Sequence, residues 1–138
     1  MDLEILKIAS NTDNNKILKN QTHNSKLKNP ICGDEMQVSV KVVKNNIVDF
    51  GYQCKSCIYC QASASLLSRN SINKTILHVK NLLKISEAFF EKKNSIFPKE
   101  WSTFNKIFNE QNISRKECLL LPFKTLGKAL KLEKSEKN

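Results

Sequence analysis

Three cysteines, Cys54, Cys57 and Cys60, form a C-x2-C-x2-C run in this chain. Thiolates held a few ångströms apart bind soft or borderline metals and iron–sulfur clusters, and such runs occur on loops that lead into helices. The run therefore indicates a metal or cluster site. A structural zinc or ferredoxin-like module is one interpretation, but the ferredoxin run requires a fourth cysteine after three residues, and that position is Ala64.

Two further segments carry candidate ligands. In Asn29-Pro30-Ile31-Cys32-Gly33-Asp34, glycine lets the backbone turn so that a thiolate and a carboxylate can face the same point. Taken alone, the segment is equally well explained as a turn before a strand. Far downstream, Cys118 follows Arg115 and Lys116 at the expected start of a helix, where the helix dipole and the basic side chains favour the thiolate.

The elements that must position these residues are predicted from periodicity. Apolar and polar residues alternate from Met36 to Val42, which predicts a half-buried strand, and residues 44–46 turn the chain into a second strand from Ile47 to Tyr52. Residues 61–70 have mostly short side chains and lack Gly and Pro, which favours a helix packed closely against the sheet. Apolar residues then recur at helical spacing over about residues 72–91, 101–110 and 118–130. We therefore expect an α+β fold, a small antiparallel sheet packed against several helices.

Length and charge limit the possible functions. A chain of 138 residues is the size of one domain, and we expect residues 1–28 to form a short helix and a flexible polar segment and residues 131–138 a polar tail. The net charge of +10 favours acidic partners, but no nucleic-acid-binding signature is present. No membrane span or secretory signal is expected, so we predict a cytoplasmic protein whose cysteines act as ligands or nucleophiles rather than in disulfides.

These segments together resemble the iron–sulfur cluster assembly scaffold family of NifU N-terminal domains, IscU and SufU. Asn29-Pro30-x-Cys32-Gly33-Asp34 is similar to the first ligand motif of the family, Cys57 with Ala62-Ser63-Ala64-Ser65 to the second, and Arg115-x-x-Cys118 to the third. The resemblance covers about residues 29–130. The long interval between Cys57 and Cys118 resembles SufU more than IscU.

The resemblance implies a SufE/NifU-like scaffold domain over residues 29–130 whose ligands are Cys32, Asp34, Cys57 and Cys118, supported by Gly33 and Arg115. The family binds Zn²⁺ or builds a [2Fe–2S] cluster with sulfur from a cysteine desulfurase, and passes the cluster to apo iron–sulfur acceptor proteins. Three thiolates and a carboxylate complete a tetrahedron, and the weaker oxygen ligand leaves one position exchangeable. Such a protein would act as a scaffold rather than an enzyme. A homodimer is one possible oligomeric state of such a scaffold.

The chain departs from the family pattern at four positions. Ser56 replaces a common glycine, and the negative charge of Glu117 opposes the Cys118 thiolate. Cys54 and Cys60 are additional to the pattern: they are alternative ligands, sulfur-accepting auxiliary thiols or buried cysteines without a role. An alternative function is a zinc-bound sulfur acceptor, in which persulfide sulfur from the desulfurase passes to Cys118 or Cys57 and the protein is a sulfurtransferase component.

Overall fold

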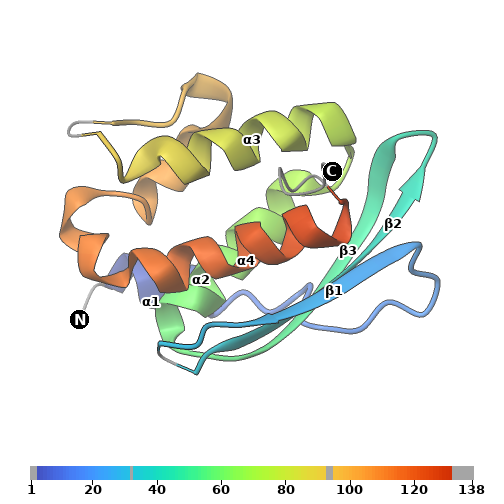
Figure 1. The fold of residues 1–138 in the computed structure, drawn as a ribbon, viewed down its shortest axis with the longest axis horizontal. Helices are drawn as coiled ribbons and strands as arrows, with labels where there is room; N and C mark the ends of the chain where they lie inside the picture. Colours follow the sequence, from blue (N-terminus) through green and yellow to red (C-terminus); the bar gives the residue numbers. More distant parts are fainter. Residues whose placement is uncertain (1–2, 32, 93–94, 132–138) are drawn as a thin grey trace.

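The computed structural model describes residues 3–31, 33–92 and 95–131. Within these ranges, four strands form one antiparallel sheet in the order β1-β2-β3-β4, and helices cover one of its faces (Figure 1). The strands are β1 (His23–Lys28), β2 (Glu35–Val43), β3 (Asn46–Lys55) and β4 (Lys74–Thr75). The helices are α1 (Leu3–Ala9), α2 (Ile58–Ser71), α3 (Ile76–Phe89) and α4 (Lys116–Ala129), with 3-10 helices η1 (Lys99–Lys106) and η2 (Glu110–Arg115). The predicted α+β fold is confirmed.

The hairpin of β2 and β3 forms the centre of the sheet. Lys44 and Asn45 connect the two strands with φ values of 52° and 67°, the left-handed conformations that a two-residue type I′ turn requires. In the resulting register Val38 lies opposite Tyr52, and Met36 opposite Cys54. This register places the buried valines on the helix-covered face of the sheet. It also brings the start of β2 beside the end of β3, where the cysteine run begins.

Strand β1 differs from the expectation of a flexible polar segment up to residue 28. Its backbone pairs antiparallel with β2 over His23–Lys28. Its side chains alternate between half-buried and exposed, and the Ser25 hydroxyl donates a hydrogen bond to the Thr125 carbonyl of α4. An edge strand needs few apolar residues, because it packs one face only and is held by main-chain hydrogen bonds. Residues 132–138, most of the expected tail, lie outside the described residues.

The helices form the layer above the sheet. Helix α4 lies across β1 and β2, α2 lies against β3, and α1 packs on α2 (Figure 1). Residues 101–110 were predicted as one helical stretch. In the structure, η1 is a 3-10 helix that is kinked at Trp101 and ends at Lys106, before the end of the predicted stretch. The Asn105 amide oxygen accepts a hydrogen bond from the Phe97 N–H, a side-chain contact that competes with regular helix. No helix among the described residues is long and apolar enough to cross a membrane.

The segment that joins α1 to β1 crosses the outer face of the sheet. The Leu18 N–H donates to the Ser39 hydroxyl, and the Lys16 carbonyl lies directly over Gly51. A Cβ atom at Gly51 would lie 2.5 Å from the Lys16 oxygen, which is too close for any side chain. Gly51 is therefore required for the close approach of this segment, which covers part of the outer face.

We predict that Gly51→Ala lowers the free energy of unfolding by about 1–3 kcal/mol, because backbone must move to relieve the clash. The matched control is Gly127→Ala in α4, where the new Cβ would lie an ordinary 3.5 Å from Leu83 Cδ1. Since alanine favours helix over glycine, this variant should be as stable as the wild type or more stable by up to about 1 kcal/mol. Urea denaturation measures both variants, and equal stabilities would contradict the assignment.

Candidate metal centre

A tight turn positions Asp34 directly before β2. The Asn29 N–H donates to the Asp34 carbonyl and the Gly33 N–H to the Asn29 carbonyl, each at 2.8 Å, while the Asn29 side chain accepts from the Ile31 N–H. Gly33 has φ +80°, a conformation that residues with a side chain rarely adopt. The glycine thus makes the turn that the sequence predicts, and Asn29 is a supporting residue that sequence reasoning did not single out.

The Asp34 carboxylate is buried without a full set of partners. Asp34 is 8 % exposed, and its Oδ2 atom accepts no hydrogen bond from the described residues. Burying a carboxylate oxygen without a partner is costly unless a donor or a cation satisfies it. The atom is therefore suited to a metal ion.

Cys57 is the N-cap residue of α2, immediately after the last strand of the hairpin. Its backbone is extended, with φ −72° and ψ 168°, and its side chain makes no capping hydrogen bond. A thiol that does not cap its own helix is available to bind a metal ion. The strand-to-helix connection thus places this thiol near the first turn of α4.

Cys118 lies in the first turn of α4 and is 6 % exposed. The small buried Ser63 of α2 lies against α4, and its hydroxyl donates to the carbonyl of Leu119 at 2.6 Å. Pro122 has no N–H with which to make the usual helix bond to the Cys118 carbonyl. The packing of the two helices thus fixes where Cys118 lies.

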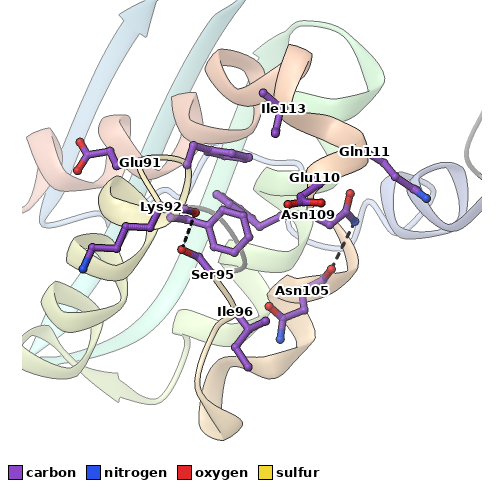
Figure 2. Close-up of a pocket in the computed structure, with 12 residues that line it drawn as sticks. Glu91, Lys92, Ser95, Ile96, Asn105, Asn109, Glu110, Gln111 and Ile113 are labelled. Carbon is purple, nitrogen blue, oxygen red and sulfur yellow. Dashed lines mark hydrogen bonds between the residues drawn. The ribbon is translucent and has the colours of Figure 1, made fainter.

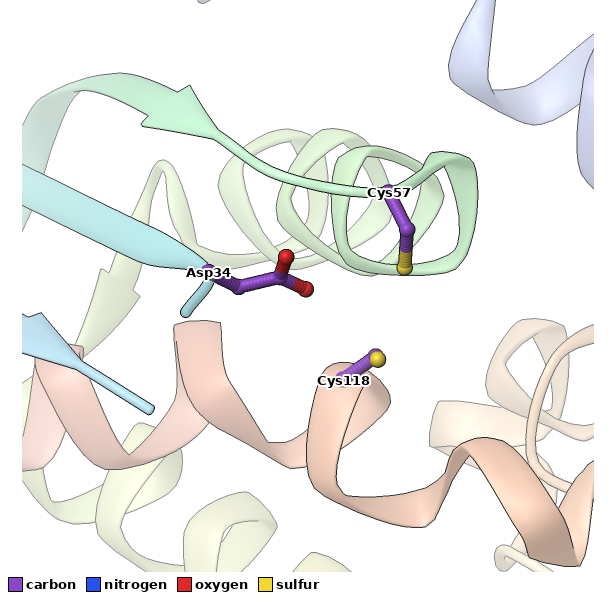
Figure 3. A group of neighbouring side chains, drawn as sticks. All are labelled: Asp34, Cys57 and Cys118. Atoms are coloured by element: carbon purple, nitrogen blue, oxygen red, sulfur yellow. The ribbon is translucent and has the colours of Figure 1, made fainter. Parts of the chain in front are cut away.

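Asp34, Cys57 and Cys118 converge although they are distant along the chain. One oxygen of Asp34 and the Sγ atoms of both cysteines all lie within 4.8 Å of one another (Figure 3). Figure 3 shows Asp34 at the entrance to a strand and each cysteine at the beginning of a helix, all facing a common point. Two thiolates and a carboxylate at this spacing can bind Zn²⁺ or iron. Cys32, the fourth predicted ligand, lies outside the described residues.

Cys54 and Cys60 are not part of this three-residue group among the described residues. Cys60 lies in the first turn of α2 with no exposed surface, and burial raises the pKa of its thiol well above the ordinary value. Burial also raises the pKa of the Cys54 thiol at the end of β3. Both side chains are therefore neutral thiols near pH 7, and they are poorer ligands than thiolates.

Arg115 does not stand alone beside the metal centre. Its guanidinium carbon lies 5.1 Å from the ring centroid of Tyr59, a cation–π geometry. Tyr59 follows Cys57 by two residues and Arg115 precedes Cys118 by three, so the pair joins the two cysteine-bearing segments. Sequence reasoning missed Tyr59, because nothing in its local pattern connects it with a residue of η2. Glu117 pairs with Lys124 at 3.5 Å on the surface of α4.

Comparison with known proteins identifies the family of this chain. The sequence matches the family model described as "NifU-like N terminal domain" over residues 3–101. It is 29% identical over 104 residues to the iron–sulfur cluster assembly scaffold protein IscU of Thermotoga maritima, which covers 75% of this chain and 73% of that protein. It is also 30% identical over 119 residues to an uncharacterized protein of Borreliella burgdorferi, covering 85% of this chain and 81% of that protein.

Solved structures have the same fold. A NifU-like N-terminal protein of Brucella abortus superposes with a TM-score of 0.85 at 19% identity, covering 98% of this chain and 94% of that one. A candidate iron–sulfur cluster assembly scaffold of the SUF system from Fervidobacterium islandicum gives 0.83 at 24% identity, covering 94% and 96%. The chain belongs to the NifU-like N-terminal domain family, which comprises the iron–sulfur cluster assembly scaffolds of the NifU, IscU and SufU type.

We predict that stability falls as pH rises above about 8.5, because the Cys60 thiol ionises near that pH in the unfolded chain but stays protonated in the fold. A raised folded pKa stabilises the protein below the unfolded pKa, and the contribution is lost with increasing pH. Cys60→Ala should reduce the slope of the free energy of unfolding against pH by up to about 1.4 kcal/mol per pH unit in this range. The slope is measured by urea denaturation of reduced, metal-free protein. Identical slopes for wild type and variant would show that Cys60 ionises equally in both states.

Proposed function

We propose that this protein is a scaffold that assembles a labile [2Fe–2S] cluster on Cys32, Asp34, Cys57 and Cys118 and transfers it to apo iron–sulfur proteins. The convergence of Asp34, Cys57 and Cys118 within 4.8 Å carries the proposal. Family membership supports it, because the curated relative from Thermotoga maritima is named for cluster assembly. A reducing compartment such as the cytoplasm would keep the thiols available as ligands.

A ligand set of thiolates and one carboxylate suits a cluster that the scaffold must release to an acceptor protein. Thiolates bind iron strongly, whereas a carboxylate oxygen is a harder and more easily displaced ligand. Asp34 provides the position at which an incoming thiolate of an acceptor protein can enter. A cysteine desulfurase would supply sulfur as persulfide, and two such sulfur atoms need four electrons to become sulfide. Two ferrous ions would give two of these electrons as they become ferric, and a thiol reductant would give the other two while it is oxidised to a disulfide.

A zinc-bound sulfur acceptor uses the same donors, since two thiolates and a carboxylate suit Zn²⁺ as well as iron. In that case the metal would hold the thiolates and the cysteine side chains would receive persulfide sulfur. Metal analysis of protein purified without oxygen separates the two functions, because iron with acid-labile sulfide supports the scaffold and stoichiometric zinc without sulfide supports the acceptor.

We predict that anaerobic incubation with ferrous iron, cysteine, a cysteine desulfurase and dithiothreitol gives a cluster that absorbs visible light. Cys32→Ser, Cys57→Ser and Cys118→Ser should each lose most of this absorbance, because each removes a thiolate ligand. Cys54→Ser is the matched control and should keep the absorbance, because burial keeps that thiol neutral. Loss in Cys54→Ser together with retention in Cys57→Ser would refute the ligand assignment.

Asp34→Ala should still assemble a cluster but transfer it at least roughly ten-fold more slowly to an apo-ferredoxin, because the exchangeable oxygen ligand is gone. Glu35→Ala is a suitable control, since this neighbouring carboxylate is partly exposed and lies 3.9 Å from Lys26 instead of facing the cysteines. The transfer rate is followed by circular dichroism of the acceptor. Unchanged transfer by Asp34→Ala would mean that the carboxylate is not the labile ligand.

A further inference from the structure

A pocket lies beside the segment that leads to α4, and none of its lining residues belongs to the metal centre. It has a volume of about 600 Å³ and lies between the end of α3 and the two 3-10 helices (Figure 2). This volume is within the roughly 300–1,000 Å³ that is usual for ligand pockets. Because η2 ends at Arg115, whatever binds in the pocket would contact the same segment that carries Cys118 into α4.

The floor of the pocket is aromatic. Phe90 and Phe108 stack with ring centroids 5.5 Å apart and an interplanar angle of 26°, and Phe89 meets Phe108 edge to face. Phe89 and Phe108 are buried, whereas Phe90 is only partly covered. The pocket therefore presents an aromatic surface on which a flat group can stack.

The polar atoms around these rings are acceptors. The Asn109 side-chain oxygen is buried and receives no hydrogen bond from the described residues. Glu110 is exposed and forms no ion pair within the described part of the chain, and Figure 2 shows its carboxylate in the middle of the pocket. Glu91 and Lys92 also line the pocket, but their charges are opposite and Figure 2 shows both side chains reaching away from Glu110. The centre of the pocket is thus locally acidic in a chain of net charge +10.

The rim is apolar and uncovered. Ile96 is 76% exposed and Ile113 is 51% exposed, on opposite segments that border the pocket. Isoleucines with this much exposed surface beside an aromatic floor are typical of an interaction site. They can cover the aliphatic stem of a long cationic side chain while its charged end reaches the acceptors.

We propose that this pocket binds an arginine side chain presented by an extended segment of a partner protein. A guanidinium group is planar, stacks on aromatic rings, and has enough N–H donors to serve Glu110 and the Asn109 oxygen together. A lysine ammonium would not offer the same flat face to Phe90. The charge complementarity between a guanidinium and the acidic centre favours this occupant, and the site goes beyond cluster chemistry because it does not require a bound metal.

The test uses the full metal-free chain and two probes of nearly the same shape, N-acetyl-leucyl-arginine amide and its analogue with citrulline, in which a neutral urea group replaces the guanidinium. Binding is followed by ¹⁵N NMR titration. The arginine probe should shift the amide signals of Phe90, Ile96 and Ile113, and the citrulline probe should bind at least roughly five-fold more weakly. Equal affinity of the two probes, shifts confined to other regions, or no shift at any soluble concentration would each overturn the proposal.

Two surface variants give the matched comparison. Glu110→Gln removes the central charge and should weaken the arginine probe at least roughly three-fold while leaving the citrulline probe unchanged. Glu87→Gln makes the same charge change at an exposed position of α3 that does not line the pocket, and it should bind as the wild type does. Equal weakening by both variants would indicate a general electrostatic attraction and would contradict a specific arginine site.

Discussion

The close packing of α2 against α4 is the constraint on which the metal centre depends. Each helix begins with one of the thiols, so the separation of the helix starts sets the separation of Cys57 and Cys118. The Ser63 hydroxyl, with no exposed surface, joins the helices through the Leu119 carbonyl at 2.6 Å. A side chain larger than serine at position 63 would push the helices apart. Ser63 therefore acts on the metal centre through helix packing.

Position relative to Asp34, rather than burial, divides the described cysteines into two kinds. Cys54 and Cys60 lie outside the group around Asp34, and desolvation raises the pKa of each thiol. Cys57 and Cys118 instead lie beside the Asp34 carboxylate, one oxygen of which has no hydrogen-bond partner among the described residues. A run of cysteines with near-regular spacing thus contains residues with different chemical roles, and the fold rather than the spacing separates them.

Much of the fold followed from local patterns in the sequence. The alternation from Met36 to Val42 and the Lys44-Asn45 turn predicted the central hairpin. Short side chains without Gly or Pro predicted α2, and helical spacing predicted α3 and α4. Strand β1 was not predicted, because its six polar and aliphatic residues are ordered by pairing with β2 and by contact with α4. Residues 101–110, which contain most of η1, were predicted as one helix, since the aromatic spacing of Trp101, Phe104 and Phe108 also occurs in α-helices.

The metal centre could be predicted only in part from the residues themselves. The motifs around Asp34, Cys57 and Cys118 identified the side chains, but their convergence depends on the tertiary packing of a turn and two helix starts. The contact of Arg115 with Tyr59 and the acidic aromatic pocket join residues that are far apart in the sequence, so no local pattern indicated either feature. Both features lie on the segments that lead into the cysteine-bearing helices.

The most direct measurement of the central claim is a crystal structure of the zinc-loaded protein, with the metal located by anomalous scattering at the zinc absorption edge. We expect one ion bound by Asp34, Cys57 and Cys118, with Cys32 as the fourth ligand. An ion bound by Cys54 or Cys60 in place of these residues, or an ion elsewhere on the surface, would contradict the account.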